Sequence, residues 1–289
     1  MYEDRYWLSE EGLKLHYRDY PGPADRPPIL CLPGLTRNAR DFANLAALLS
    51  PRWRVLAVDL RGRGKSEYAK DPMTYLPLTY ARDVQDLLRD LEIDRYVAFG
   101  TSLGGLLTMI LAASGTGEIA GAMLNDVGPE LEPGGLGRIR TYVGKSQTWP
   151  TWMHAARAVG EANRDVYPGY AIEDWLAMAK RLYRLNSSGR VVLDYDMKIA
   201  EPFRVPGNES GTEMWHAFEQ LKKVPTLIVR GGLSDLFAAS VADRMLAVLD
   251  QGELVTVPDV GHTPTLDEPE VVDAVERLLA QVAKEPVAA

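Results

Sequence analysis

Hydrophobic positions follow two different spacings along this chain. Short continuous apolar runs, such as residues 55–58 and 96–99, predict buried strands. Between such runs, apolar residues recur every three or four positions, as in 81–91 and 270–283, and this period predicts amphipathic helices. Strands that alternate with helices are typical of a mostly parallel sheet covered on both faces. The pattern therefore predicts an α/β fold.

The alternation stops between about residues 128 and 221. This stretch predicts helices and loops, and we expect it to form a helical lid inserted between two parts of one core, residues 1–127 and 222–289. Tryptophans gather in it and could line an apolar pocket, since ligand pockets are rich in aromatic residues. The alternative, that each one only packs the insertion together, stays open. These tryptophans are Trp149, Trp152, Trp175 and Trp215.

Residues 100–104 read Gly-Thr-Ser-Leu-Gly and lie between a predicted strand, 96–99, and a predicted helix, 106–113. A serine on such a turn adopts a strained backbone, the small neighbours relieve crowding, and the hydroxyl is exposed above the sheet. Helix amides at this point can stabilise negative charge. The context favours Ser102 as a nucleophile over the alternative of an idle serine in a glycine-bounded turn.

A serine nucleophile needs a base, and the chain has four histidines. His262 follows the predicted strand 253–257 and a short turn, which places an imidazole on a loop at one edge of the sheet. We expect His16 on the surface or on a sheet face, and His154 and His216 to be packing or pocket-lining groups. His262 is the predicted base.

Nearly the whole chain resembles α/β-hydrolases, in particular bacterial carboxylesterases and lactonases that carry a lid. Residues 28–35, Pro-Ile-Leu-Cys-Leu-Pro-Gly-Leu, resemble the family's strand and oxyanion loop, and 59–66, Asp-Leu-Arg-Gly-Arg-Gly-Lys-Ser, match its D-x-R-G-x-G-x-S turn. Residues 260–262 and 267–269 resemble the histidine loop. One departure is Pro33 before Gly34, where the family usually has histidine.

Asp235 lies on the loop after the predicted strand 225–230, within reach of His262. The chain order Ser102, Asp235, His262 is the order of the α/β-hydrolase triad, so Asp235 is the favoured acid. Asp126, which follows the predicted strand 120–125, is the alternative, because some relatives carry the acid there. Asp59 is expected to hold its own turn.

The resemblance implies a serine hydrolase that cleaves carboxylic esters or lactones of apolar small molecules through an acyl-enzyme. The backbone amides of Leu35 and Leu103 would form the oxyanion hole. Carbon–carbon bond hydrolysis and perhydrolysis by the same triad remain alternatives. A ligand-binding, receptor-like module on a hydrolase scaffold is the alternative from another class.

The composition of this 289-residue chain limits the kinds of molecule that we expect it to bind. A net charge of −8 argues against nucleic acid and anionic membranes as partners, so we expect a small-molecule ester or lactone. No zinc motif and no phosphate-binding loop is present, so we expect no metal and no cofactor. The sequence shows no signal peptide or membrane-spanning run, from which a cytoplasmic location is expected. It does not give the oligomeric state.

Overall fold

The computed structural model describes residues 1–202 and 214–284. Its main sheet has eight strands in the order β1-β2-β4-β3-β5-β6-β10-β11. The strands are β1 (Glu3–Leu8), β2 (Lys14–Tyr20), β3 (Ile29–Leu32), β4 (Val55–Asp59), β5 (Arg95–Thr101), β6 (Glu118–Asn125), β10 (Thr226–Gly231) and β11 (Gly252–Val257).

Only the first part of this sheet is antiparallel. The ribbon β1-β2 pairs antiparallel, and β2 pairs antiparallel with β4. From β4 to β11 every neighbouring pair is parallel. The carboxyl ends of these parallel strands therefore meet at one edge, where ligands of such sheets bind. The predicted α/β class, with its mostly parallel sheet, is confirmed.

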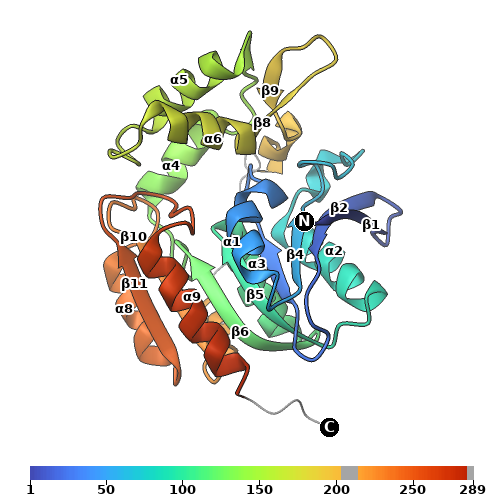
Figure 1. Cartoon of the computed structure of the whole chain (residues 1–289), viewed down its shortest axis with the longest axis vertical. Helices are drawn as coiled ribbons and strands as arrows, with labels where there is room; N and C mark the ends of the chain where they lie inside the picture. Colours follow the sequence, from blue (N-terminus) through green and yellow to red (C-terminus); the bar gives the residue numbers. More distant parts are fainter. Residues whose placement is uncertain (203–213, 285–289) are drawn as a thin grey trace.

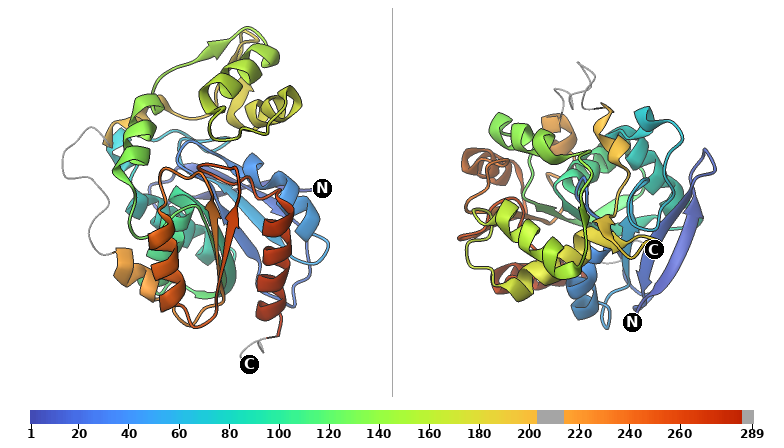
Figure 2. Two further views of the ribbon diagram at one scale, coloured as in Figure 1. Left: turned by 90° about the vertical axis from the view of Figure 1, so that its left-hand side faces the viewer. Right: turned by 90° about the horizontal axis from the view of Figure 1, so that it is seen from above.

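Helices cover both faces of the sheet (Figures 1 and 2). On one face lie α1 (Ala43–Leu49) and α9 (Pro269–Val282), whose apolar side chains share a core with β3 and β4. On the other face lie α2 (Pro77–Asp90), α3 (Leu103–Ser114), α7 (Met214–Glu219) and α8 (Ala239–Val248). The three-to-four spacing of apolar residues in these helices places one stripe against the sheet.

The inserted stretch lies over the carboxyl edge of the sheet (Figures 1 and 2). It is not purely helical, because a small three-stranded sheet in the order β7-β9-β8 accompanies its helices. These strands have two or three residues, too few to show a period in the sequence. The elements are α4 (Pro133–Tyr142), β7 (Thr148–Trp149), α5 (Trp152–Asn163), α6 (Ile172–Leu182), β8 (Tyr183–Leu185), β9 (Val191–Leu193) and η3 (Met197–Ala200).

Most of the insertion has a core of its own. Side chains of α5, α6 and the short strands form a separate apolar cluster that includes Ala155, Trp175 and Val191. By contrast α7, near the end of the expected lid, packs on α3 in the main core. The part of the chain that stands above the sheet edge is thus α4 to β9.

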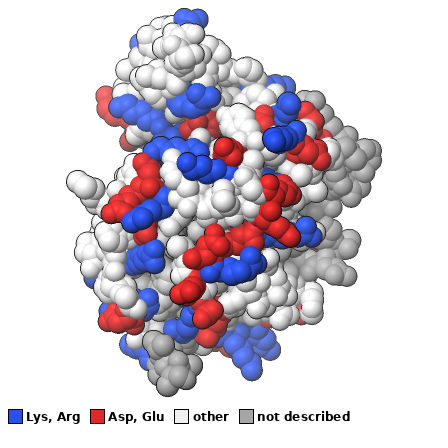
Figure 3. All heavy atoms as spheres, turned by 90° about the vertical axis from the view of Figure 1, so that its right-hand side faces the viewer, with Lys and Arg blue, Asp and Glu red and all other residues white. Residues whose placement is uncertain are grey.

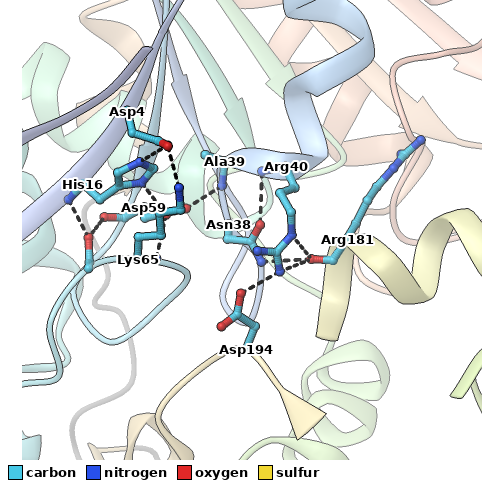
Figure 4. Close-up of polar contacts among 10 residues, drawn as sticks. Asp4, His16, Asn38, Ala39, Arg40, Asp59, Lys65, Arg181 and Asp194 are labelled. Atoms are coloured by element: carbon cyan, nitrogen blue, oxygen red, sulfur yellow. Dashed lines mark hydrogen bonds and ion pairs between the residues drawn. The ribbon is translucent and has the colours of Figure 1, made fainter. Parts of the chain in front are cut away.

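Polar contacts fasten this part to the core (Figure 4). The Arg40 guanidinium, in the short helix η1 (Ala39–Phe42), pairs with Asp194 at 2.6 Å and donates to the Arg181 carbonyl at 2.8 Å. Asn38 Nδ2 donates to the same carbonyl at 3.0 Å. A second core loop, the one after β4, also takes part: the Gly64 amide donates to the Asp194 carbonyl at 3.1 Å. The insertion is therefore held to two core loops.

Asp59 organises the second of these loops, as its motif predicts (Figure 4). Its Oδ1 accepts the Ala39 amide at 2.7 Å, and its Oδ2 accepts the Lys65 amide at 2.9 Å. His16 lies on the sheet face, only 1% exposed, with Nδ1 2.7 Å from Asp59 Oδ2 and Nε2 2.8 Å from Asp4 Oδ1. The surface alternative for His16 is therefore wrong.

Charges are mixed on the face of the molecule that Figure 3 shows. Acidic and basic side chains are interspersed there, and no extended field of one sign forms on it. Such mixing weakens long-range attraction to polyanions. None of the helices in residues 1–202 and 214–284 has both the length and the apolar character needed to cross a bilayer.

Candidate active site

Ser102 occupies a sharp turn between β5 and α3. Its backbone has φ 51° and ψ −115°, a strained region for a residue with a side chain. Glycines make the turn possible: a Cβ on Gly104 would lie 1.9 Å from the Leu32 carbonyl oxygen, and one on Gly100 would lie 2.3 Å from the Gly104 carbonyl oxygen. The G-x-S-x-G spacing thus meets the steric demand of the turn, as expected.

A continuous hydrogen-bonded line runs from this serine to a buried carboxylate. Ser102 Oγ lies 2.9 Å from His262 Nε2, and His262 Nδ1 lies 2.7 Å from Asp126 Oδ2. The His262 side chain is 8% exposed and that of Asp126 is fully buried. The structure therefore joins Ser102 to His262, as predicted, in the geometry of a nucleophile, a base and an orienting acid.

The Asp126 carboxylate is held from three directions. Oδ1 accepts the Gly231 amide at 2.8 Å, and Oδ2 accepts the Ser234 hydroxyl at 2.6 Å in addition to facing His262. The backbone of Asp126 has φ 55°, and its amide donates to the Val229 carbonyl at 2.8 Å. A buried carboxylate requires such donors, and they fix its orientation toward the imidazole.

Asp235, the favoured acid, does not contact His262. Its carboxylate forms a bidentate pair with Arg138, with Nε–Oδ2 at 2.6 Å and Nη2–Oδ1 at 2.8 Å. Hydrogen bonding to Arg138 lowers the pKa of Asp235, whose side chain is 43% exposed. The expected contact of Asp235 with His262 is wrong, because Asp126 takes that place.

The reason lies in strand order. β6, which Asp126 follows, is the direct neighbour of β5 and its serine, whereas β10 lies one strand further away. The turn after β10 presents Ser234 to the buried carboxylate and leaves the next residue, Asp235, facing α4. Chain order alone does not distinguish these two positions.

The backbone amides of Leu35 and Leu103, the expected oxyanion hole, belong to two segments next to Ser102. Leu103 is the first residue of α3, where an amide has no partner within the helix. The Gly34 carbonyl accepts the Arg37 amide at 3.1 Å, so the Leu35 N–H of the same peptide group points the opposite way. A Cβ on Gly34 would lie 3.7 Å from Ser102 Cβ, which places this loop beside the nucleophile.

Comparison with known proteins identifies the family of this chain. Residues 29–275 match the model of a family described as the alpha/beta hydrolase family. The chain belongs to this family. An alpha/beta hydrolase of known structure from Novosphingobium aromaticivorans is 56% identical, with a TM-score of 0.94, and the match covers 97% of this chain and 98% of that one. The family and fold expected from the motifs are confirmed.

Two curated relatives have named activities. A 3-hydroxybutyrate-oligomer hydrolase of Cupriavidus necator is 33% identical over 270 residues, 91% of this chain and 92% of the relative. A 2-(acetamidomethylene)succinate hydrolase of Mesorhizobium japonicum is 26% identical over 245 residues, 85% of this chain and 84% of the relative. Both match along most of their length, so the similarity includes the insertion.

In this alpha/beta hydrolase, the insertion also positions the histidine loop. The Gly261 amide donates to the Val166 carbonyl at 2.7 Å, and the Tyr167 hydroxyl donates to the Thr263 carbonyl at 2.7 Å. These contacts lie directly before and after His262. No sequence pattern singles out Val166 or Tyr167, because only the folded chain brings them to this loop.

The four tryptophans of the insertion have different surroundings. Trp175 is 8% exposed within the insertion core, where its ring lies 4.9 Å from that of Tyr170. Trp149 and Trp152 are partly buried against the same cluster. Trp215 lies on the outside of the core, where its Nε1 donates to Glu130 at 2.6 Å and Arg244 lies 4.4 Å above its ring. Trp175 and Trp215 therefore have packing contacts, and a pocket role stays a prediction for Trp149 and Trp152.

The part of the alpha/beta hydrolase that the structure describes contains no cluster of three or more His, Cys, Asp or Glu side chains arranged to hold a metal ion. Cys31 is buried in β3, where burial raises the pKa of its thiol. In the described residues, hydrogen bonds bring Ser102, His262 and Asp126 together as the candidate site.

Proposed function

We propose that this protein hydrolyses carboxylic esters through an acyl-enzyme on Ser102. The observation that supports the proposal most directly is the line Ser102 Oγ, His262 Nε2, His262 Nδ1 and Asp126 Oδ2, with spacings of 2.9 and 2.7 Å. A weak hydroxyl nucleophile acquires a base in this arrangement, and the base acquires a fixed tautomer.

In the first half of the reaction, His262 Nε2 takes the proton of Ser102 as Oγ attacks the ester carbonyl. Asp126 does not accept that proton; it stabilises the imidazolium through the Nδ1 hydrogen bond. The Leu35 and Leu103 amides donate to the oxygen that becomes negative, and each such donor contributes roughly 3 kcal/mol. His262 then gives its proton to the leaving alcohol.

In the second half, water attacks the acyl-enzyme and gives a proton to His262 Nε2. Collapse of this tetrahedral intermediate breaks the bond to Oγ, which takes the proton back. The products are a carboxylic acid and free Ser102. The chain's own side chains supply every proton transfer, and no cofactor is part of the proposal.

For the substrate, we propose oligomers or small esters of hydroxy acids. The 33% identical relative that spans nearly the whole chain is named as a 3-hydroxybutyrate-oligomer hydrolase. Lactones, which are cyclic esters of hydroxy acids, pass through the same acyl-enzyme and remain within the proposal. The segment from α4 to β9 would act as the lid, since it lies over the sheet edge and holds the His262 loop through Tyr167.

A fluorophosphonate probe tests the proposal, because it labels serines that have been activated as nucleophiles. We expect labelling and ester hydrolysis in the native protein and neither in Ser102→Ala. Ser114→Ala, at the exposed other end of the same helix, is the matched control and should behave like the native protein. Labelling that survives Ser102→Ala would contradict the assignment.

A further inference from the structure

Two arginines, one after the loop of Gly34 and one in the insertion, share one hydrogen-bonding pattern. Arg37 follows the oxyanion loop and holds Asp41 through Nε and Nη2, with Nη2–Oδ1 at 2.9 Å. Arg138, in α4 of the insertion, holds Asp235 through the same two nitrogens. In each pair one edge of the guanidinium is occupied, and Nη1 has no hydrogen-bond partner among the described residues.

Arg37 lies next to the proposed nucleophile. The Cβ position at Gly34 is 3.2 Å from Arg37 Cγ and 3.7 Å from Ser102 Cβ. The side chain is only 25% exposed, and its pairing with Asp41, itself 16% exposed, restricts its rotation. A guanidinium fixed in this way loses little further entropy when it binds a ligand.

Arg138 lies on the insertion, in contact with Asp235 on the loop after β10. Arg138 and Tyr142 are four residues apart in α4 and therefore share a helix face. Burial raises the pKa of the Tyr142 hydroxyl, and the charges of both Arg138 and Arg37 oppose that rise. Asp235, its carboxylate partner, directly follows Ser234, whose hydroxyl donates to the Asp126 carboxylate at 2.6 Å. Arg37 thus lies on the core loop beside Ser102, and Arg138 lies on the insertion at the loop that holds Asp126.

The hydrogen-bonding capacity of these two ion pairs is unbalanced toward donors. The Asp41 and Asp235 carboxylates use both oxygens on their own arginines. Each guanidinium has five N–H donors, and the pairing leaves those on Nη1 unused. A ligand with a planar pair of acceptor oxygens matches this surplus best, and arginine binds carboxylates with favourable geometry.

We propose that Arg37 and Arg138 form a carboxylate subsite, so that the enzyme selects esters with a free carboxylate a few bonds from the scissile carbonyl. The inference rests on the proposed ester hydrolysis and adds a determinant of specificity to it. Both arginines act in substrate binding, and the bond-breaking steps on Ser102 are unchanged.

Two matched substrates test the subsite: the linear dimer of 3-hydroxybutyrate and the same dimer with its terminal acid converted to a carboxamide. Loss of a charge-assisted hydrogen bond reduces kcat/KM by about tenfold to a hundredfold. We expect the native enzyme to prefer the acid by a factor in this range. Arg37→Gln and Arg138→Gln should reduce the preference through a higher KM for the acid, and Arg37→Lys should restore part of it.

Arg52→Gln is the matched control. Arg52 also pairs with a carboxylate, that of Glu276, but it lies before β4, at the opposite edge of the sheet from Ser102. It should retain the native preference. Binding of both dimers to Ser102→Ala, measured by calorimetry, gives a readout independent of turnover, and the acid should bind more tightly.

The outcomes separate the two proposals. Equal kcat/KM for the acid and the carboxamide in the native enzyme, or an unchanged ratio in Arg37→Gln, overturns the subsite while ester hydrolysis stands. Equal affinity of Ser102→Ala for both dimers also overturns it. No turnover of either dimer or of p-nitrophenyl butyrate overturns the proposed function itself.

Discussion

Replacing Asp126 by asparagine changes one atom of the proposed triad, and the structure fixes how the new amide must lie. The Gly231 N–H is a backbone donor that cannot rotate, and it faces Oδ1 at 2.8 Å. The amide oxygen of the variant must take that position, because an NH₂ group there would meet another donor. The NH₂ group then takes the Oδ2 position, 2.7 Å from His262 Nδ1.

This orientation reverses the tautomer of the imidazole. An NH₂ group facing Nδ1 requires Nδ1 to accept, which moves the ring proton to Nε2. Nε2 faces Ser102 Oγ at 2.9 Å and can then no longer take the serine proton. The same change in a well-studied serine protease costs about 10⁴ in kcat, which corresponds to roughly 5 kcal/mol of transition-state stabilisation. We expect a loss of this order in Asp126→Asn.

The assay is kcat for a chromogenic ester across pH, with Asp235→Asn as the matched control. Asp235 pairs with Arg138 and does not touch the imidazole, so its variant should lose much less than Asp126→Asn. Thermal melting checks that both variants are folded. If Asp126→Asn retained kcat within tenfold of the native enzyme and Asp235→Asn lost most of it, the geometric argument would be refuted.

Further predictions concern packing and charge. Gly104→Ala should fail to give an active fold, since the new methyl group would lie 1.9 Å from the Leu32 carbonyl oxygen; expression and circular dichroism check this, and a folded, active variant would contradict it. Trp175→Ala should lower stability by about 3–5 kcal/mol in denaturant unfolding without changing acyl-chain preference, because the indole is buried inside the insertion. Since Arg138 holds the pKa of Asp235 below its ordinary 3.8, the pair stabilises the fold above pH 3.8 and loses this effect as pH falls through the lowered pKa. The melting temperature of the native protein should therefore exceed that of Asp235→Asn at neutral pH, and the difference should vanish in strong acid; a difference that grows on acidification would be inconsistent with this sign.

The α/β class and the position of Ser102 were accessible from local patterns. The spacing of apolar residues shows which face of a helix or strand is buried. The glycines at 100 and 104 are needed because a Cβ at either position would clash with a nearby backbone carbonyl. His262 was accessible for a related reason, since a chain with four histidines offers few candidates and only this one follows a late strand. In each case the decisive neighbours lie close together along the chain.

The identity of the acid that contacts His262 depends on residues far apart in the sequence. Asp126 and Asp235 both follow apolar strands, and nothing within either segment distinguishes them. The choice depends on β6 lying beside β5 in the sheet, and on the Gly231 amide and Ser234 hydroxyl reaching Asp126 across 105 and 108 residues of sequence. Strand order is a property of the whole sheet, so it cannot be read from the period of one strand.

The surroundings of the site follow the same division. An aromatic cluster in the insertion was visible in composition, but the outward position of Trp215 and the contact of Tyr167 with the His262 loop come from how the insertion packs on the core. Arg37 pairs with Asp41 four residues further along the chain, whereas Arg138 pairs with Asp235 across 97 residues. The spacing of apolar residues determines which side of each helix or strand is buried. Which charged groups become neighbours depends on how these elements pack together. Electrostatic and hydrogen-bond energies depend on distances in space, and the order of residues along the chain does not contain those distances.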